Sequence, residues 1–109
     1  MPGVRRGPVE PRAAWPLVLG RLSVDLTSYT VMLDGQRLPL KASQVELVAV
    51  LIANRHRVTS REELCERIGV RNARSVDVLL SSLRRILGEG FVRTVRSRGW
   101  ILESRAFEG

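Results

Sequence analysis

Arginine is the residue type that gives this sequence its clearest means of binding another molecule. Of the 18 Lys and Arg residues only Lys41 is a lysine, and residues 71–98 carry seven arginines against Asp77 and Glu89, a charge of +5 in a chain of net charge +7. A guanidinium group binds phosphate oxygens and guanine edges through paired hydrogen bonds and stays charged at every relevant pH. Because the charge is clustered, we expect a binding face for an anionic partner.

Residues that could form disulfides, bind metals or carry out catalysis are scarce. His56 and Cys65 are the single histidine and the single cysteine, so the chain can form neither an internal disulfide nor a Cys/His zinc set. We expect His56 to lie in a loop and Cys65 to be a small, partly buried hydrophobe in a reducing cytosol. Without a nucleophile–base pair or a metal cluster, we predict no enzyme and no cofactor.

The length of 109 residues suits one domain. The longest apolar run, Val45 to Ala53, contains Glu46 and falls far short of the roughly 20 residues that cross a bilayer. The N-terminus has arginines but no apolar stretch of a secretory signal. We therefore expect a soluble cytoplasmic chain without membrane contact. It divides into a Pro- and Arg-rich tail or linker (1–16), a folded domain (17–103) and a C-terminal tail (104–109).

The first part of the folded domain reads as short strands, over residues 17–19, 22–26 and 29–33. Apolar and polar residues alternate there with a period of two, and β-branched residues follow. Asp34-Gly35 is a strong two-residue hairpin signal, and residues 37–40 form the returning strand. Because Pro39 has no N–H to donate, that strand is predicted to lie at an edge or to end early.

Two capping-box pairs predict the next two helices. Ser43 and Glu46 precede apolar residues at helical spacing, so the first helix is expected to begin at Ser43. Ser60 and Glu63 open a second, shorter helix, which Gly69 stops.

The third helix is the clearest element. Its apolar residues recur at i, i+3, i+4, i+7, i+10 and i+11, a continuous stripe that faces a core. A strand over residues 91–95, a basic turn over 96–99 and a partner strand over 100–102 follow, with Gly99 supplying a positive φ. This order describes a helix-turn-helix with a basic β-wing. The stripe consists of Val76, Leu79, Leu80, Leu83, Ile86 and Leu87.

Three stretches carry a family resemblance: LPLKASQVELVAVLIANRHRVTSREEL, RSVDVLLSSLRRILG and VRTVRSRGWIL. They resemble the OmpR/PhoB-type winged-helix DNA-binding domains of bacterial response regulators, over residues 17–103. The resemblance implies an α+β winged helix-turn-helix with an N-terminal antiparallel four-stranded sheet, three helices and a C-terminal β-hairpin wing. It also implies a sequence-specific transcription regulator that binds double-stranded DNA, with the third helix in the major groove and two copies head-to-tail on direct repeats.

The resemblance also indicates which side chains contact DNA. Arg74 and Arg84 resemble positions that hold phosphates, and such contacts orient a protein without specifying sequence. Arg96 matches the family's wing arginine, which enters a minor groove where narrow A·T stretches concentrate negative potential. A solvated surface is the alternative for each of them. The candidate DNA-binding residues are Arg74, Ser75, Val78, Ser81, Ser82, Arg84, Arg85, Thr94, Arg96 and Arg98.

Two neighbouring residues are given other roles. Asp77 is expected to orient an arginine or to cap the start of the helix, since a carboxylate would repel phosphate. Trp100, where the family usually has a tyrosine, is expected to pack in the core.

The sequence departs from the family pattern in three places. Only the segment 1–16 precedes the matching part, where the family has a phosphoacceptor receiver domain. The connection over residues 69–73 is shorter than usual, and family activators often touch RNA polymerase there, so activation through that contact is not expected. Leu79, Ser81 and Ser82 stand where many members place His or Arg, which reduces base readout by long basic side chains.

Two other functions stay open at this point. A winged helix can also dock on proteins such as RNA polymerase or sigma factor, and the short base-reading residues keep that alternative open. The basic face also suits a general nucleic-acid binder, for example of structured RNA. Competition between specific duplex, random duplex and RNA distinguishes the three.

Overall fold

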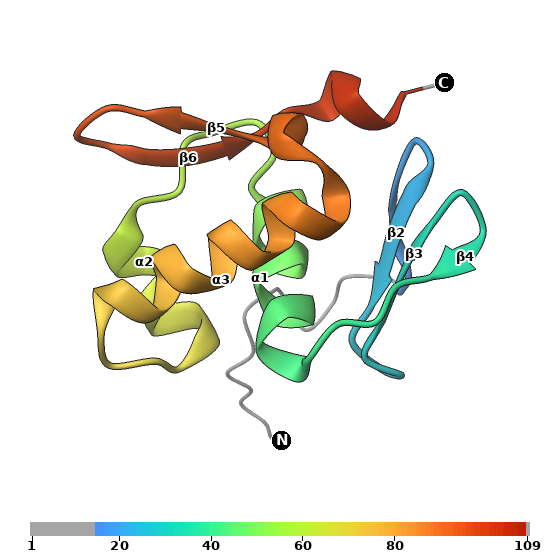
Figure 1. The fold of residues 1–109 in the computed structure, drawn as a ribbon, viewed down its shortest axis with the longest axis horizontal. Helices are drawn as coiled ribbons and strands as arrows, with labels where there is room; N and C mark the ends of the chain where they lie inside the picture. Colours follow the sequence, from blue (N-terminus) through green and yellow to red (C-terminus); the bar gives the residue numbers. More distant parts are fainter. Residues whose placement is uncertain (1–14, 109) are drawn as a thin grey trace.

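The computed structural model describes residues 15–108 as three α-helices, two short 3-10 helices and two sheets. The four-stranded antiparallel sheet, in the order β1-β2-β3-β4, lies at the right in Figure 1, and β5 and β6 pair as a separate hairpin along the top of that view. The elements follow in the expected order, which confirms the predicted fold class. Residues 1–14 of the predicted tail 1–16 lie outside the described residues.

The four-stranded sheet turns alternate side chains toward the helices. Leu22, Val24 and Val31 are buried, and Val24 pairs with Val31 across two strands. Asp34 and Gly35 have φ values of 54° and 78°, the two positive values that a type I′ hairpin requires. The predicted Asp34-Gly35 turn is therefore confirmed. The strands are β1 (Leu17–Leu19), β2 (Leu22–Asp25), β3 (Thr30–Leu33) and β4 (Gln36–Arg37).

The returning strand β4 is short and lies at the sheet edge. It spans two residues, against the four predicted over 37–40, and the Leu38 N–H then donates to the Val31 carbonyl at 2.9 Å. The strand ends before Pro39, as expected for a residue that cannot donate to a neighbouring strand.

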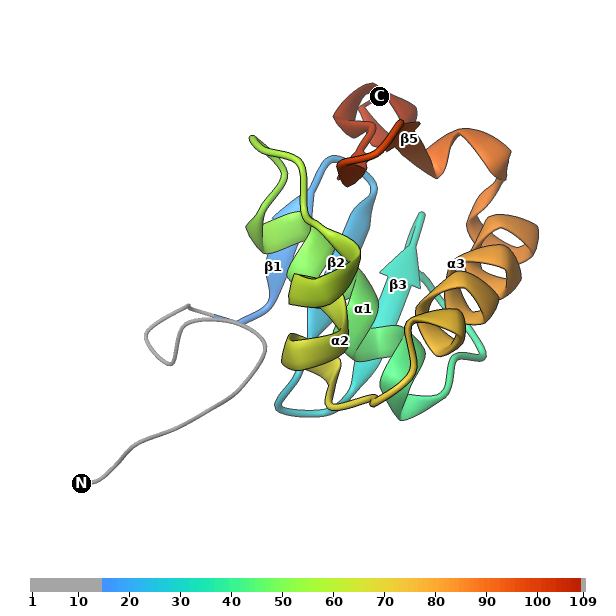
Figure 2. The ribbon, with the colours of Figure 1, turned by 90° about the vertical axis from the view of Figure 1, so that its left-hand side faces the viewer.

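Helix α1 (Ala42–Ala53) is the centre of the core. It contacts β1, β2, α2, α3 and β6, and Figure 2 shows it in front of the four-stranded sheet, with α2 nearer the viewer and α3 to the right. A helix covered on nearly every side needs apolar residues all round. The run Val45 to Ala53 supplies them, and residues 47–52 are all buried.

The predicted Ser43–Glu46 capping box is wrong. The helix begins one residue earlier, at Ala42, because the side-chain oxygen of Gln44 accepts a hydrogen bond from the Lys41 N–H at 2.7 Å. The Glu46 carboxylate instead accepts from the Tyr29 hydroxyl at 2.7 Å. This bond ties the β2–β3 turn to α1 and raises the pKa of Tyr29.

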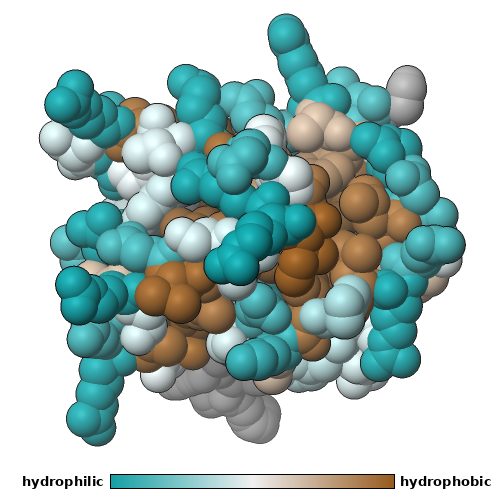
Figure 3. All heavy atoms as spheres, viewed as in Figure 1, coloured by the Kyte–Doolittle hydropathy of each residue, from teal (hydrophilic) through white to brown (hydrophobic). Residues whose placement is uncertain are grey.

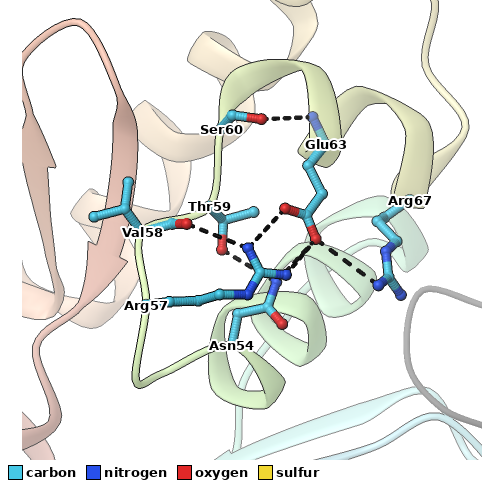
Figure 4. Close-up of polar contacts among 7 residues, drawn as sticks. All are labelled: Asn54, Arg57, Val58, Thr59, Ser60, Glu63 and Arg67. Carbon is cyan, nitrogen blue, oxygen red and sulfur yellow. Dashed lines mark hydrogen bonds and ion pairs between the residues drawn. The ribbon is translucent and has the colours of Figure 1, made fainter.

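Helix α2 (Arg61–Ile68) begins as predicted at Ser60, whose hydroxyl oxygen accepts from the Glu63 N–H at 3.1 Å. The Glu63 carboxylate does not complete the predicted box, because it is engaged by the preceding turn. Arg57 donates to its two oxygens at 2.9 and 2.7 Å, and Asn54 donates at 3.3 Å (Figure 4). These bonds, above all the one from Arg57, lower the pKa of Glu63. The turn between α1 and α2 is thereby fixed.

The folded part extends beyond the predicted end at Glu103. The short 3-10 helix η2 (Ser104–Phe107) carries Phe107 into the core, where 2% of it is exposed. The Phe107 carbonyl also accepts from the Arg21 N–H at 2.8 Å. A tail over 104–109 is therefore wrong for residues 104–107, because the aromatic ring fills the core. At the other end Trp15, assigned to the tail 1–16, packs against the same core.

Candidate nucleic-acid interface

Helix α3 (Ala73–Leu87) is oriented by its predicted apolar stripe. Val76, Leu80 and Leu83 are buried, and the other three members are partly buried. Asn72 caps the helix, since its side-chain oxygen accepts from the Arg74 N–H at 2.8 Å. Because burial fixes the inward face, the opposite face of α3 must be exposed.

Four residues of α3 form an exposed stripe opposite the core, which we call the outer stripe. They recur at i, i+4, i+7 and i+11, the spacing of one helix face. Its two terminal arginines are eleven residues apart, about 16 Å along the helix axis. The partly buried Ser75 and Arg84 flank it. The outer stripe consists of Arg74, Val78, Ser81 and Arg85.

Ser82 lies on the side of α3 that meets α1. Its hydroxyl donates to the Leu79 carbonyl at 2.8 Å and accepts from the Gln44 amide at 2.8 Å. Its single proton and one of its lone pairs are thus used within the protein, whereas Ser81 is exposed. Gln44 joins the start of α1 to the second half of α3, a role that sequence analysis missed because Gln44 and Ser82 are 38 positions apart.

The hairpin of β5 (Val92–Val95) and β6 (Gly99–Leu102) forms the predicted wing. Its turn holds the two predicted arginines, Arg96 and Arg98, and both are exposed. The Arg98 N–H donates to the Val95 carbonyl at 2.9 Å, and Ser97 between the arginines has a φ of 65°. The turn is therefore tight, and it presents two guanidinium groups to solvent.

Strand β6 of the wing is bonded, close to the turn, to the segment before α2. Thr59 and Trp100 exchange two backbone hydrogen bonds of 2.8 and 2.9 Å. Gly99 has the predicted positive φ, at 144°, and a Cβ there would lie 2.0 Å from the Thr59 carbonyl oxygen. Trp100 is 7% exposed, which confirms its predicted place in the core. Glycine is thus required at position 99 for two reasons: the Thr59 backbone leaves no room for a side chain, and the φ of this residue is positive.

Arg61, at the first position of α2, links the two basic elements. Its guanidinium group donates to the Asp77 carboxylate at 3.2 Å and lies over the Trp100 ring, 5.4 Å from the centroid. Asp77 therefore orients an arginine, one of its two expected roles, while Asn72 provides the helix cap. Sequence analysis missed Arg61 because its two partners lie 16 and 39 positions away, beyond any local pattern.

A second link joins α3 to the wing directly. The Arg84 guanidinium donates to the Thr94 hydroxyl at 3.2 Å. The residue before Thr94 in β5, Arg93, is paired at 2.8 Å with Glu103, which directly follows β6, so this arginine is engaged within the hairpin region. Two predicted contacts from different elements, Arg84 and Thr94, thus lie side by side.

The other candidates for chemistry lie apart from this face. His56 is exposed in the α1–α2 turn, and Cys65 is a partly buried free thiol on α2. Among residues 15–108, no group of three or more potential metal ligands is found. Within the same residues, no helix has the length and apolar character to cross a membrane.

A four-stranded sheet, three helices and a basic hairpin beside an exposed arginine-bearing helix define the winged helix-turn-helix class. Residues 35–102 match the family described as transcriptional regulatory protein, C terminal, and the chain belongs to this family. This match confirms the resemblance that the sequence motifs suggested.

Individual relatives agree with that assignment. The chain is 32% identical over 99 residues to the response regulator protein PmrA of Pseudomonas aeruginosa, covering 87% of this chain and 45% of that protein. It is 28% identical over 109 residues to the phosphate regulon transcriptional regulatory protein PhoB of the same species, covering 94% and 47%. The chain thus spans less than half the length of these curated relatives.

Among solved structures, the DNA-binding domain of CpxR from E. coli superimposes with a TM-score of 0.72. It is 28% identical, and the match covers 82% of this chain and 96% of that domain.

Proposed function

We propose that this domain binds double-stranded DNA at specific sequences and so regulates transcription, with α3 in the major groove and the wing turn at the adjacent minor groove. The observation that carries this proposal is the hydrogen bond from Arg84 to Thr94, which holds the outer stripe and the basic turn as one surface. A major groove about 12 Å wide admits an α-helix. Membership of a family of transcription regulators, and similarity to a DNA-binding domain, support the same conclusion.

The arginines of α3 bind phosphates in this proposal. Arg74 and Arg85 stand at the two ends of the outer stripe, and Arg84 reaches the backbone together with Thr94. Such contacts set the orientation and register of the helix and carry no sequence information. Ser75 and Ser81 face base edges, where short hydroxyl groups discriminate weakly. Ser82 supports the helix from α1, because its hydroxyl is already engaged.

The wing arginines act in the minor groove. Arg96 enters it, where a narrow A·T stretch offers the most negative potential, and Arg98 binds the phosphates at its rim. Both side chains are exposed on a turn whose base is bonded to Thr59. A rigid support of this kind favours a defined contact over a loose electrostatic one.

The proposed protein partner, a second copy of the chain, is taken from the family resemblance. Two copies bind head-to-tail on direct repeats in the bacterial cytoplasm, and they associate on the DNA. The connection between α2 and α3 has four residues, Gly69 to Asn72, and offers little chain for a polymerase contact. Repression by occupancy, or activation through another surface, is therefore the expected mode of regulation.

Selection from a random duplex library followed by binding competition tests the proposal. The expected result is one enriched motif, bound more tightly than random duplex or structured RNA at the same salt concentration. Equal binding to all three nucleic acids would make the domain a general nucleic-acid binder. No binding to nucleic acid, with binding to RNA polymerase or sigma factor, would make it a protein-interaction module.

A further inference from the structure

Gln44 is a polar residue buried at the start of α1, with 7% of it exposed. Its side-chain oxygen accepts from the Lys41 N–H at 2.7 Å, and its amide nitrogen donates to the Ser82 hydroxyl at 2.8 Å. That hydroxyl donates in turn to the Leu79 carbonyl at 2.8 Å. Three hydrogen bonds thus connect the residue before α1 to the second half of α3, and no polar atom in this series is left without a partner.

The position that Gln44 holds adjoins the outer stripe of α3. Ser82 follows Val78 by four residues and precedes Arg85 by three, the two spacings at which side chains are neighbours on a helix surface. Ser82 is itself partly buried, on the side toward α1. Gln44 therefore fastens α3 at the margin of the face that meets the major groove in the proposed function.

The apolar contacts of α3 leave its rotation about its own axis less well defined. Burial of aliphatic side chains is non-directional, whereas a hydrogen bond needs a narrow range of distance and angle. Beside the hydrogen bond lies a groove of about 330 Å³, lined by Ser43 of α1 and by Val78 and Leu79 of α3 among others. Figure 3 shows hydrophobic surface over the left-hand, N-terminal part of α3. Because the helices leave space there, α3 has room to rotate once the bond is removed.

A small rotation of α3 is enough to disturb base recognition. An α-helix with its side chains has a radius of about 5–6 Å, so a rotation of about 10° moves an outward side-chain tip by about 1 Å. A binding site must hold its groups to within about 0.5 Å. Long arginine side chains tolerate such a shift, because their contacts with phosphates are electrostatic and independent of sequence. The loss should therefore fall on the choice of sequence more than on affinity for any duplex.

We propose that Gln44 is a positioning residue that determines sequence specificity. Its hydrogen bond to Ser82 holds α3 at the rotation where the outward side chains meet base edges. Gln44 acts through α3, since it is buried behind that helix and lies outside the outer stripe. The proposal rests on the proposed function and adds a determinant of specificity away from the DNA-contacting surface.

Gln44→Met is the first test. Methionine has a similar length and favours a helix, but its side chain cannot donate to Ser82. The measured quantity is the specificity ratio, which is the dissociation constant for random duplex divided by that for the selected duplex at the same salt concentration. We expect this ratio to fall about fivefold, the factor that the net free energy of one hydrogen bond supplies. The free energy of unfolding should change little, because Lys41 is exposed and water can replace its lost acceptor.

Ser82→Ala separates positioning from direct contact with a base. Alone it should lower the specificity ratio by about the same factor as Gln44→Met, and the double variant should lower it no further, because both residues act through one hydrogen bond. Ser82→Thr keeps the hydroxyl group and should keep most of the preference. Gln44→Ala takes the place of Gln44→Met in this cycle if the methionine variant does not fold.

Val31→Ala is the control for a general loss of stability. Val31 is fully buried in β3, away from α3, so its truncation should lower the free energy of unfolding and leave the specificity ratio unchanged. Circular dichroism confirms that every variant is folded under the binding conditions.

The outcomes distinguish this inference from the proposed function. A domain that selects no duplex motif overturns both. Specific binding with an unchanged ratio in the Gln44 variant overturns the role of Gln44 alone, and so does an equal loss of affinity for both duplexes. Effects of Gln44→Met and Ser82→Ala that multiply in the double variant would assign Ser82 to direct base contact, which also contradicts the proposal.

Discussion

The guanidinium group of Arg84 donates to the hydroxyl of Thr94 across 3.2 Å, and this bond joins the third helix to the wing. Both residues were expected to contact DNA, but they come from elements that are separate in the sequence. Arg61 makes a parallel connection through Asp77 and Trp100. The helix and the wing are therefore held in one relative position before any DNA is bound, which lowers the entropic cost of binding.

Arg84→Ala should weaken binding to the selected site and to random duplex by about the same factor, about 1 kcal/mol in each case, because a phosphate contact carries no sequence information.

Thr94→Val removes the hydroxyl group that accepts the hydrogen bond from Arg84 and keeps the shape of the side chain. A double-mutant cycle on DNA binding should give a coupling of about 0.5–1 kcal/mol between the two residues. Strictly additive effects would show that the hydrogen bond does not contribute to binding.

Duplex binding should depend strongly on salt. Seven arginines fall within residues 71–98, and about four or five phosphate contacts give a log–log slope of roughly −4. Arg74→Ala should reduce the steepness by about one unit. Arg37→Ala removes an exposed arginine from β4 and should not change the slope. A slope near zero for the unaltered domain would contradict electrostatic docking.

Arg96→Ala should cost about 1–3 kcal/mol on the selected site and flatten the preference for A·T pairs beside it. The expected loss is large because the base-facing part of α3 offers short side chains, so groove shape carries more of the specificity. The measurement compares selected and random duplex at one salt concentration, with folding of the variant confirmed. If both duplexes lose affinity equally, the wing is an electrostatic clamp and reads no sequence.

Gly99→Ala should destabilise the wing. The variant forces a side chain into a φ of 144° and against the Thr59 carbonyl, at a cost of about 3 kcal/mol in the free energy of unfolding. Gly88→Ala is a useful comparison, since its φ is 105° but nothing lies within 4 Å of its added Cβ. Urea unfolding should show a smaller loss for Gly88→Ala; equal losses would mean that the close approach to Thr59 is unimportant.

Stability should fall in acid partly through Glu63. Its pKa is lowered in the folded state, first by the hydrogen bond from Arg57, so its contribution is complete above the ordinary glutamate pKa of 4.5 and is lost as the pH falls through the lowered value. Glu63→Gln should cost about 1 kcal/mol at neutral pH, since the Arg57 side chain is 53% exposed and screened by solvent.

Urea titrations at neutral and acidic pH measure this effect. The free energy of unfolding of Glu63→Gln should change less between the two conditions than that of the unaltered protein. Glu66→Gln, an exposed position on the same helix, is the control and should follow the unaltered protein. An unchanged pH dependence in Glu63→Gln would exclude the carboxylate as a contributor.

The sequence alone determined the order of the elements, the inward face of α3 and the exposed basic turn of the wing. These features depend on residues a few positions apart. The six-residue apolar stripe of α3 needs only the helix period, the Asp34-Gly35 turn needs only its two backbone conformations, and Ser60 caps α2 through a residue three positions on. Patterns that depend on residues so close together can be recognised from the amino-acid sequence alone.

Tertiary structure decided which polar side chains of the basic face are free. Ser81 and Ser82 are neighbours with the same chemistry, yet Ser82 is engaged by Gln44, 38 positions away, while Ser81 is exposed. Phe107 likewise fills the core, and the backbone near it bonds to Arg21, 86 positions earlier. No local pattern encodes such partners, because a hydrogen bond or a core contact between distant residues exists only once the helices and the sheet have packed.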